Sequence, residues 1–277
     1  GVVGLVLGYL ALLLVNAGIG VIWDHIPASW ESTPAWYVIG ILLIAAVLVY
    51  VVRRFVGDAG HSPIGGITVS PLTPKDYVGA ILAILASLWG GIVLGPEVAL
   101  VATGSMVGTV TAKAMGFTDA ASQKKIVGIG AVGAILGLLV GPILAGSVQL
   151  DSTPTAIELA QLGWAIPIAI IASVAVTLSR LVAALLARAT GGGPHLIILI
   201  SAALIVAFSA ILLQFWTGES VVFVLTSGEG LISDLPSLTS ISTVIAVLLL
   251  KSIAYAVSLG AGFRGGPFFP AMFVGAA

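Results

Sequence analysis

The chain has 277 residues, of which 59% are hydrophobic and 8% charged, and its mean hydropathy is +1.22. Ten Lys and Arg residues and eleven Asp and Glu residues cannot cover the surface of a soluble domain, in which roughly 25% of residues are charged. The formal net charge of −1 leaves no basic patch for nucleic acid, and the absence of cysteine excludes disulfides, thiolate metal sites and cysteine nucleophiles. This composition predicts an integral membrane protein without a nucleic-acid partner.

Long apolar runs predict that the membrane segments are helices. A spanning helix needs about 20 apolar residues, whereas barrel strands alternate apolar and polar residues over about ten positions. The clear runs are Val2–Trp23, Trp36–Val52, Tyr77–Leu94, Lys125–Val140, His195–Trp216 and Thr243–Leu259. No basic segment precedes the first run, so no signal peptide is expected. We therefore predict an all-α, multi-pass protein of the cell membrane (plasma or inner membrane).

Basic residues predict the orientation of the first two helices. The loop 24–34 contains no Lys or Arg, whereas the second apolar run ends at Arg53 and Arg54. Basic residues favour the cytoplasmic side, so the loop 24–34 is expected to lie outside.

Glycine and proline interrupt the apolar pattern near residues 57–66, 95–97 and 141–142. A break inside the bilayer exposes backbone N–H and C=O groups, which is tolerated only where protein buries them or where they line a cavity. These interruptions therefore indicate a transport pathway. The later segment Pro154–Ala189 would be about 54 Å long as one helix, so we expect it to divide at Pro167 or to project beyond the membrane.

An internal repeat appears when the sequence is shifted by 171 positions. The segment Ser87-Leu88-x-x-Gly91-x-x-x-Gly95-Pro96 then falls on Ser258-Leu259-x-x-Gly262-x-x-x-Gly266-Pro267, and Asp58 falls on Glu229. Two halves with equivalent broken helices are typical of inverted-repeat transporters. We predict a first half at 1–171 and an inverted second half at 172–277. Residues 107–171 have no counterpart, so the second half is expected to lack about 65 residues of the repeat.

The Gly-Pro pair of each repeat precedes an apolar run, so each is expected to start a helix inside the membrane. Helix N-termini supply unpaired N–H donors and about half a positive charge, and two of them aimed at one point would bind an anion. Glu97 follows the first pair, at bilayer depth, where an ionisable group is a functional-site candidate. Its carboxylate could occupy the anion position and leave when an anion or a proton arrives. The alternative is a glutamate that only satisfies the start of its own helix.

These motifs resemble those of the CLC chloride channels and proton-coupled chloride antiporters. Gly91–Val98 is similar to the family's G-x-x-x-G-[KR]-E-G-P motif and places Glu97 at the gating glutamate. Lys125–Gly146 is similar to the stretch A-A-x-x-x-A-F-x-A-P-L-A-G, and Gly262–Pro270 to G-G-x-F-x-P. Pro96 departs from the family pattern, which has a basic residue there.

The resemblance implies two inverted helical halves per subunit and a homodimer with one pore in each subunit. It implies transport of chloride or a similar small monovalent anion, with a bound chloride or other halide and no cofactor. The anion is expected to bind at Gly95, Val98, Phe268 and Phe269, with Glu97 as the gate. The sequence contains no catalytic constellation and no metal-ligand spacing, so neither an enzyme nor a metal site is expected.

The inner anion site of the family is less well matched. Its G-S-G-I-P motif is replaced by Gly60-His61-Ser62-Pro63. Alignment on the proline places Gly60 at the anion-binding serine, whereas alignment on the serine selects Ser62, with His61 as a further donor. The alternative is that this segment only caps a short helix.

The inner proton path of the antiporters is also altered. Their inner glutamate falls on Ser152, which has no carboxylate. Asp151 and Glu158 are the candidates for an inner proton path, and the alternative is that both are acids of a solvated loop. The sequence therefore leaves open a channel and a proton-coupled exchanger.

Two other functions compete with anion transport. An inverted-repeat carrier of a cation or an organic solute would also contain broken helices, but helix N-termini with few acids favour anions. A non-transporting membrane subunit would need no acid at a helix break, so Glu97 argues against it. The expected partners are a small inorganic anion, membrane lipid, a second copy of the chain and, for an exchanger, protons.

Overall fold

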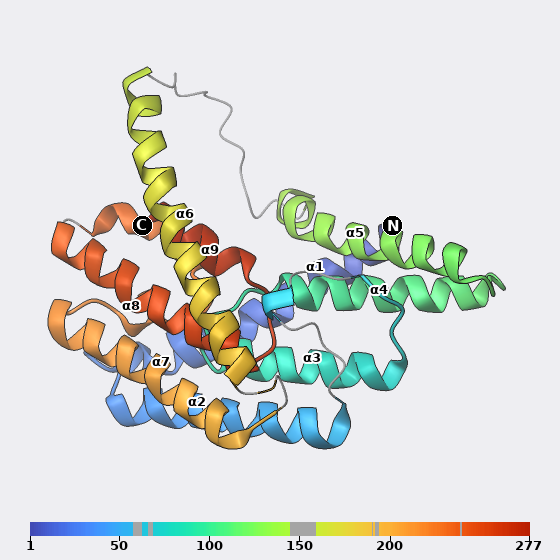
Figure 1. Cartoon of the computed structure of the whole chain (residues 1–277), viewed down its shortest axis with the longest axis horizontal. Coiled ribbons are helices and arrows are strands. Elements are labelled where there is room, and N and C mark those ends of the chain that lie inside the picture. The colour runs from blue at the N-terminus through green and yellow to red at the C-terminus, as the bar shows by residue number, and fades with distance from the viewer. Residues whose placement is uncertain (58–62, 66–68, 145–158, 190, 192–193, 239) are drawn as a thin grey trace.

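The structure, a computed structural model, describes residues 1–57, 63–65, 69–144, 159–189, 191, 194–238 and 240–277. Within these residues the regular structure is helical, apart from one isolated bridge between Gly95 and Gly266. Figure 1 shows a bundle of crossing helices from which one end of α6 projects. The α-helices are α1 Val2–Gly20, α2 Ala35–Val51, α3 Pro74–Trp89, α4 Glu97–Ala114, α5 Ala120–Leu144, α6 Leu159–Ala189, α7 Leu196–Thr217, α8 Ile241–Gly260 and α9 Phe268–Ala276.

Five segments of the described chain are helical, long and apolar enough to cross a membrane. They are Val2–Ser29, Ala35–Val56, Ile166–Ala189, Leu196–Thr217 and Ile241–Gly260. They contain the first two and the last of the predicted apolar runs, and all of the run His195–Trp216 except His195. The prediction of an all-α, multi-pass membrane protein is thus confirmed.

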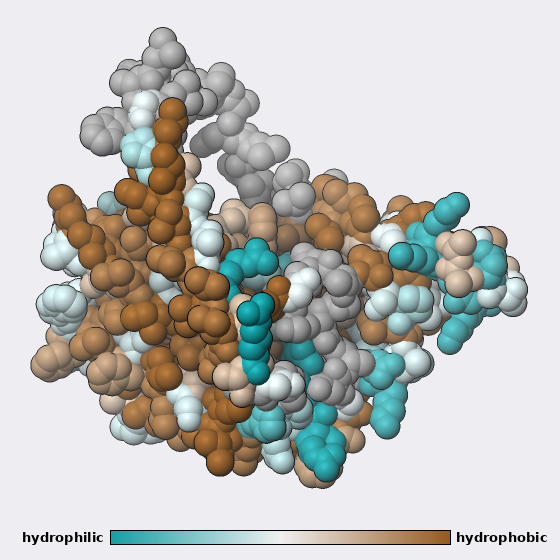
Figure 2. Space-filling view, in the orientation of Figure 1, coloured by the Kyte–Doolittle hydropathy of each residue, from teal (hydrophilic) through white to brown (hydrophobic). Residues whose placement is uncertain are grey.

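The surface is apolar over much of its extent, as lipid contact requires. Figure 2 shows hydrophobic residues over α6 and α8, and hydrophilic residues gathered at the end of the molecule where α4 turns into α5. On α6, side chains such as Ile170, Leu178 and Leu185 are more than half exposed. Exposure of such an apolar surface to water costs free energy, whereas contact with lipid hydrocarbon does not.

Small residues let the helices approach closely. A Cβ atom at Gly4 of α1 would lie 2.6 Å from the carbonyl oxygen of Gly130 on α5, and one at Gly8 would lie 2.6 Å from that of Ala134. Contacts of this kind are typical of helix packing in membranes. As a result α1, α4 and α5 pack together, α2 packs on α7, and α8 packs on both α6 and α7.

The start of α3 follows from its local sequence. The hydroxyl of Thr73 accepts the amide of Asp76 at 3.2 Å and donates to the Asp76 carboxylate at 2.6 Å, and Pro74 occupies the first helical position. The helix ends at Trp89, because Gly91 adopts a φ of +81°. The apolar run predicted to Leu94 therefore stops being helical five residues earlier.

Two predicted interruptions differ from the structure. α5 continues through Gly141 and Pro142 to Leu144, and α6 continues through Pro167. A proline removes one backbone hydrogen bond, which a long apolar helix can tolerate in a membrane. With 31 residues, α6 is about 46 Å long, which exceeds a hydrocarbon core of about 30 Å.

Candidate functional site

Two interruptions of the helical structure meet inside the molecule. The first break, residues 90–96, separates α3 from α4, and the second break, residues 261–267, separates α8 from α9. The amides of Gly95 and Gly266 each donate to the carbonyl of the other at 2.7 Å. These two glycines are equivalent in the repeat, so the structure brings equivalent points of the two halves into direct contact.

A pair of buried serines joins the breaks in a reciprocal way. The hydroxyl of Ser258 accepts the amide of Val93 at 3.3 Å, and the hydroxyl of Ser87 accepts the amide of Arg264 at 3.1 Å. Ser87 and Ser258 are equivalent in the repeat, as are Val93 and Arg264. Each half thereby satisfies an amide that the break frees in the other half, as a buried backbone group requires.

The turns that begin the two breaks accept hydrogen bonds from residues that are distant in the sequence. Gly91 and Gly262 have φ values of +81° and +96°, which favour glycine. The carbonyl of Gly91 accepts the amide of Thr226 at 3.0 Å, and the carbonyl of Gly262 accepts Nη1 of Arg53 at 2.6 Å. The two turns are therefore alike in backbone but are held by different partners.

Glu97 is the first residue of α4, and its side chain is only 4% exposed. Its Oε1 atom accepts the amide of Phe268, the first residue of α9, at 2.5 Å. The amides of Phe269 and of Glu97 itself also interact with this carboxylate. A negative group thus lies at the N-termini of two helices that come from opposite halves, which is the geometry of an anion site.

The glycines of the breaks make room for this carboxylate. A Cβ atom at Gly266 would overlap the carboxyl carbon of Glu97, and one at Gly95 would overlap Oε2. Oε2 itself has no hydrogen-bond partner among the described residues. The position of Glu97 therefore depends on the absence of side chains at Gly95 and Gly266.

Two residues of α8 hold backbone close to α9. The position of Lys251 in an apolar run predicts that it is buried near a carbonyl or faces water, and the first alternative is confirmed. The hydroxyl of the buried Tyr255 donates to the carbonyl of Pro267 at 2.7 Å. Nζ of the buried Lys251 lies within 3.4 Å of four carbonyl oxygens, those of residues 223–226, and 4.3 Å from the ring centroid of Phe273. An ionisable side chain inside an apolar run was the available signal for Lys251, whereas nothing in the sequence marked Tyr255.

The structure groups most of the predicted anion-binding residues that it describes. Val98, Phe268 and Phe269 lie at the two helix starts beside Glu97. Gly95 is placed there too, but its amide is engaged with Gly266, so it joins the breaks instead of offering a donor. The remaining predicted positions, Gly60, His61, Ser62, Asp151 and Glu158, lie outside the described residues.

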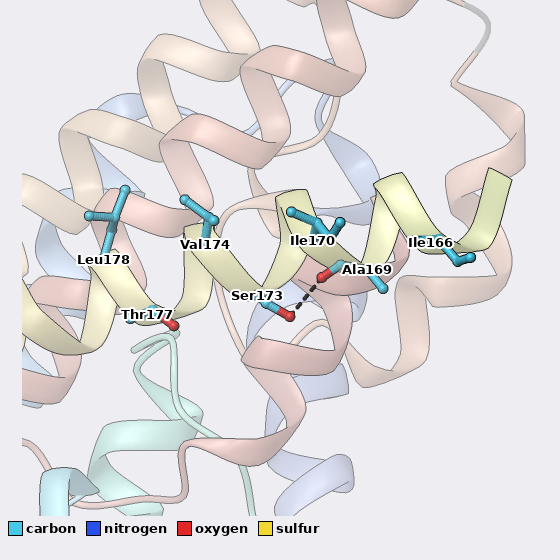
Figure 3. A pocket seen from close by; sticks show the side chains of 7 residues that line it. All are labelled: Ile166, Ala169, Ile170, Ser173, Val174, Thr177 and Leu178. Atoms are coloured by element: carbon cyan, nitrogen blue, oxygen red, sulfur yellow. Dashed lines mark hydrogen bonds between the residues drawn. The ribbon is translucent and has the colours of Figure 1, made fainter. Parts of the chain in front are cut away.

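A surface depression elsewhere lacks such chemistry. This depression of about 530 Å³ lies along α6, and Figure 3 shows that α6 alone supplies its side chains. Its polar groups are hydroxyls, one of which, that of Ser173, donates to the Ala169 carbonyl at 2.6 Å. Nothing in this lining orients an ion, so the helix breaks are the candidate functional site. No cluster of three or more metal-ligating side chains is present in the part of the chain that the structure describes.

Curated relatives match most of the chain. The "putative ion-transport protein YfeO" of Escherichia coli O127:H6 is 24% identical over an alignment of 314 positions, which covers 92% of this chain and 70% of that protein. The protein of the same name from Salmonella schwarzengrund is 33% identical over 81 residues, which cover 27% of this chain and 20% of that protein.

A family match covers the C-terminal part of the chain. Residues 125–277, more than half of the chain, match the family described as voltage gated chloride channel. The matched part includes the second break and α9, whose first amide binds Glu97. The chain therefore belongs to the voltage gated chloride channel family.

Proposed function

We propose that this chain transports chloride or another small monovalent anion across the cell membrane, through a pathway gated by Glu97. The observation that carries the proposal is the hydrogen bond from the amide of Phe268 to Oε1 of Glu97. This bond holds a carboxylate at the N-termini of α4 and α9, where each helix offers free N–H donors and about half a positive charge.

Glu97 stands in this arrangement where a transported anion would bind. An arriving anion competes with the carboxylate for the amides of Phe268 and Phe269, and the side chain leaves as the anion binds. A proton on the carboxylate has the same effect, because a neutral carboxyl group is a weaker acceptor of hydrogen bonds. The flux is therefore expected to rise as the pH falls.

The chemistry of the breaks favours an anion over a cation or an organic solute. Cation sites are built from carbonyl and carboxylate oxygens, whereas helix N-termini offer N–H groups. The first and second breaks contain no Asp or Glu, and Glu97 directly follows the first. With Glu97 displaced or neutral, the site offers a negative ion several N–H donors at the starts of α4 and α9.

Family membership and the ion-transport name of the relatives support ion transport in general. From the resemblance of the motifs we further propose that the bound ion is a halide, in the first place chloride. We also propose that no cofactor takes part, that the chain is not an enzyme, and that two copies form a homodimer in the plasma membrane with one pathway in each subunit.

The gate is tested by Glu97→Gln, measured as chloride efflux from liposomes that contain the purified protein. The substitution keeps the shape of the side chain but removes its titration, so efflux is expected to become independent of pH. Glu31→Gln, which alters an exposed acid of the loop 24–34, is the matched control and should behave as wild type. Wild-type pH dependence in Glu97→Gln would refute the gating role.

A second measurement distinguishes a channel from an exchanger. Chloride efflux and proton uptake are recorded together at several imposed chloride gradients. A fixed ratio of chloride to protons indicates an exchanger, and flux without coupled protons indicates a channel. Flux of sodium or of an organic solute that is indifferent to replacement of chloride would refute anion transport itself.

A further inference from the structure

A second carboxylate, that of Glu229, lies close to the gate. Glu229 begins the short 3₁₀ helix η6 (Glu229–Ser237) in the connection between α7 and α8. Its charge interacts with that of Glu97. Each of these two carboxylates has one buried oxygen without a hydrogen-bond partner among the described residues. The sequence singled out Glu229 only as the repeat counterpart of Asp58.

The backbone around Glu229 is bonded to the first break and packs against α9. The amide of Thr226 bonds to the carbonyl of Gly91 at 3.0 Å. Gly228 has a φ of +77°, and a Cβ atom there would lie 2.5 Å from the ring of Phe273 on α9. Glycine therefore allows the loop to approach α9 closely, which keeps Glu229 beside the helix whose first amide binds Glu97.

A cavity of about 260 Å³ borders Glu229. Its other walls include Asn16 and Gly20 of α1, Asp24 of the adjoining π-helical turn η1 (Val21–His25), and Leu231 of η6. This volume has room for several water molecules, and the polar groups of the wall can hydrogen-bond to them. The cavity can thus hold a water path that reaches Glu229.

The charges around this cavity suit protons better than anions. The loops 24–34 and 218–240 contain five acids and no Lys or Arg. They lie on one side of the molecule, because Nε2 of Gln214 at the end of α7 donates to the carbonyl of Thr33 at 2.9 Å. The positive-inside rule assigns this side to the exterior. Acidic walls concentrate protons and repel anions, so the cavity is a poor entrance for chloride.

We propose that Glu229 is the outer proton-exchange residue of the Glu97 gate, an inference that rests on the proposed function. A hydronium ion in the cavity protonates the Glu229 carboxylate and leaves a water molecule. Glu229 then passes this proton to the Glu97 carboxylate, directly or through one water molecule, and becomes a carboxylate again. One proton moves and no electron is transferred, while the anion uses the separate site at the starts of α4 and α9.

The neighbouring ionisable groups leave this role to Glu229. η1 contributes Asp24 and His25, α4 contributes Glu97, α8 contributes Lys251 and Tyr255, and η6 itself also contains Asp234, whereas α9 contributes none. The ammonium group of Lys251 is surrounded by backbone carbonyls. Burial raises the pKa of Glu229 to about 7, so this group can both accept and release a proton near neutral pH.

The test uses sealed membrane vesicles from expressing cells, loaded with chloride, in right-side-out and in inverted orientation. Efflux is followed with a chloride electrode after the bath pH is stepped from about 7.5 to about 5.5, which spans the range near neutral where acid–base groups work best. In right-side-out vesicles Glu229→Gln should respond about tenfold more slowly than wild type, because proton transfer by a positioned side chain is lost. In inverted vesicles it should respond as wild type.

Three further variants make the result specific. Glu229→Asp retains a carboxyl group and should restore most of the response to outer pH. Asp234→Asn alters an exposed acid of the same helix η6 and should behave as wild type. A wild-type response of Glu229→Gln to outer pH would overturn the proposal, and so would an equal loss in both orientations. If Glu97→Gln itself keeps the wild-type response, the proposed gate fails, and this outcome is distinguishable from a failure of Glu229 alone.

Discussion

The first and second breaks share one backbone geometry but differ in the side chains that hold them. In the second break, the hydroxyl of Tyr255 bonds to the carbonyl of Pro267, and nearby Lys251 bonds to backbone carbonyls of the loop that precedes α8. The equivalent positions of the first half are Ile84 and Ala80, which have no polar side-chain atom. The helix that precedes the second break thus holds that break through the hydroxyl of Tyr255, whereas the equivalent residue of α3, Ile84, has no polar side-chain atom.

The first break is followed directly by an acid, Glu97, whereas the second is followed by Phe268. Glu97 is equivalent to Phe268, and the bond between them joins a side chain of the first half to a backbone amide of the second. A backbone amide in an anchored turn is a fixed receptor, whereas a side chain can change its rotamer. In the proposed gate, the first half therefore supplies the side chain that moves, and the second half supplies the backbone amide that binds it.

Gly266→Ala should have the largest effect on function, because the new Cβ atom would overlap the Glu97 carboxyl group. The carboxylate is expected to leave its position at the Phe268 amide, so that chloride efflux becomes fast and independent of pH. The measurement is efflux from liposomes as a function of pH. Gly275→Ala, at a position on α9 where a Cβ atom meets only an ordinary contact at 3.8 Å, is the matched control.

The same substitution in a Glu97→Ala background sharpens the comparison. Without a carboxyl group at Glu97 there is nothing to displace, so the double variant should equal Glu97→Ala in its efflux. A further change in the double variant would mean that Gly266 acts through the backbone and not through the gate.

Lys251→Met should cause the largest loss of stability. The substitution retains an apolar chain of similar length but leaves four carbonyl oxygens without their shared donor. Hydrogen bonds to charged groups contribute about 1.5–3 kcal/mol each, so we expect a loss of about 3 kcal/mol or more. Unfolding in detergent measures it, with the half-exposed Ile253→Ala as a control on the same helix. A loss below about 1 kcal/mol would contradict the anchoring role.

Ser87→Ala and Ser258→Ala should lower the free energy of unfolding by similar amounts, because the two hydroxyls make equivalent hydrogen bonds across the breaks. Each variant leaves a buried amide unpaired, which costs about 1–3 kcal/mol. Ser209→Ala is the control, since its hydroxyl bonds only to the carbonyl of Ile205 in its own helix. The loss of unfolding free energy is measured in detergent. Clearly unequal losses in the two variants would show that the two serine bonds are not energetically equivalent, although the two breaks have the same backbone geometry.

Glu229→Gln should have the smallest effect on stability, and this effect should depend on pH. The pKa of Glu229 is raised in the folded protein to about 7, above its ordinary value of 4.5, so the folded state binds the proton more tightly. Stability from this group is present at low pH and is lost as the pH rises through this range. The variant should gain about 1 kcal/mol over wild type between pH 5 and 8, after allowance for solvent screening. A constant difference, measured by unfolding across this range, would contradict the raised pKa.

Much of the fold could be predicted because the signals are local. The first two and the last apolar runs, and all of His195–Trp216 except His195, lie within helices that can span the membrane. The Gly-Pro pair before Glu97 marks a real interruption, whereas the pair at Gly141 and Pro142 lies inside a continuous helix. The difference is one of packing. The backbone groups that lose their helical hydrogen bonds near Gly95 and Pro96 find partners in the second break, whereas a single proline inside a helix leaves few backbone groups without a partner.

The candidate site was predictable only in part. Glu97 and Phe268 could be named from the repeat, because an acid at a helix break is rare in a membrane. Tyr255 and Glu229 could not be assigned roles. A tyrosine in an apolar helix and an acid in a polar loop are both ordinary, so neither residue stands out in the sequence. The bonds of Ser87 and Ser258 were likewise unforeseen, although the repeat aligns both residues.

The sequence by itself determined that this is a bundle of membrane helices with two equivalent interruptions and an acid after one of them, because hydropathy and Gly-Pro pairs act on neighbouring residues. Only the tertiary structure decided which groups complete the site. The decisive bonds join residues 165, 171 and 177 positions apart. They form because the amides freed inside an apolar environment need a partner, and folding supplies that partner from the other half.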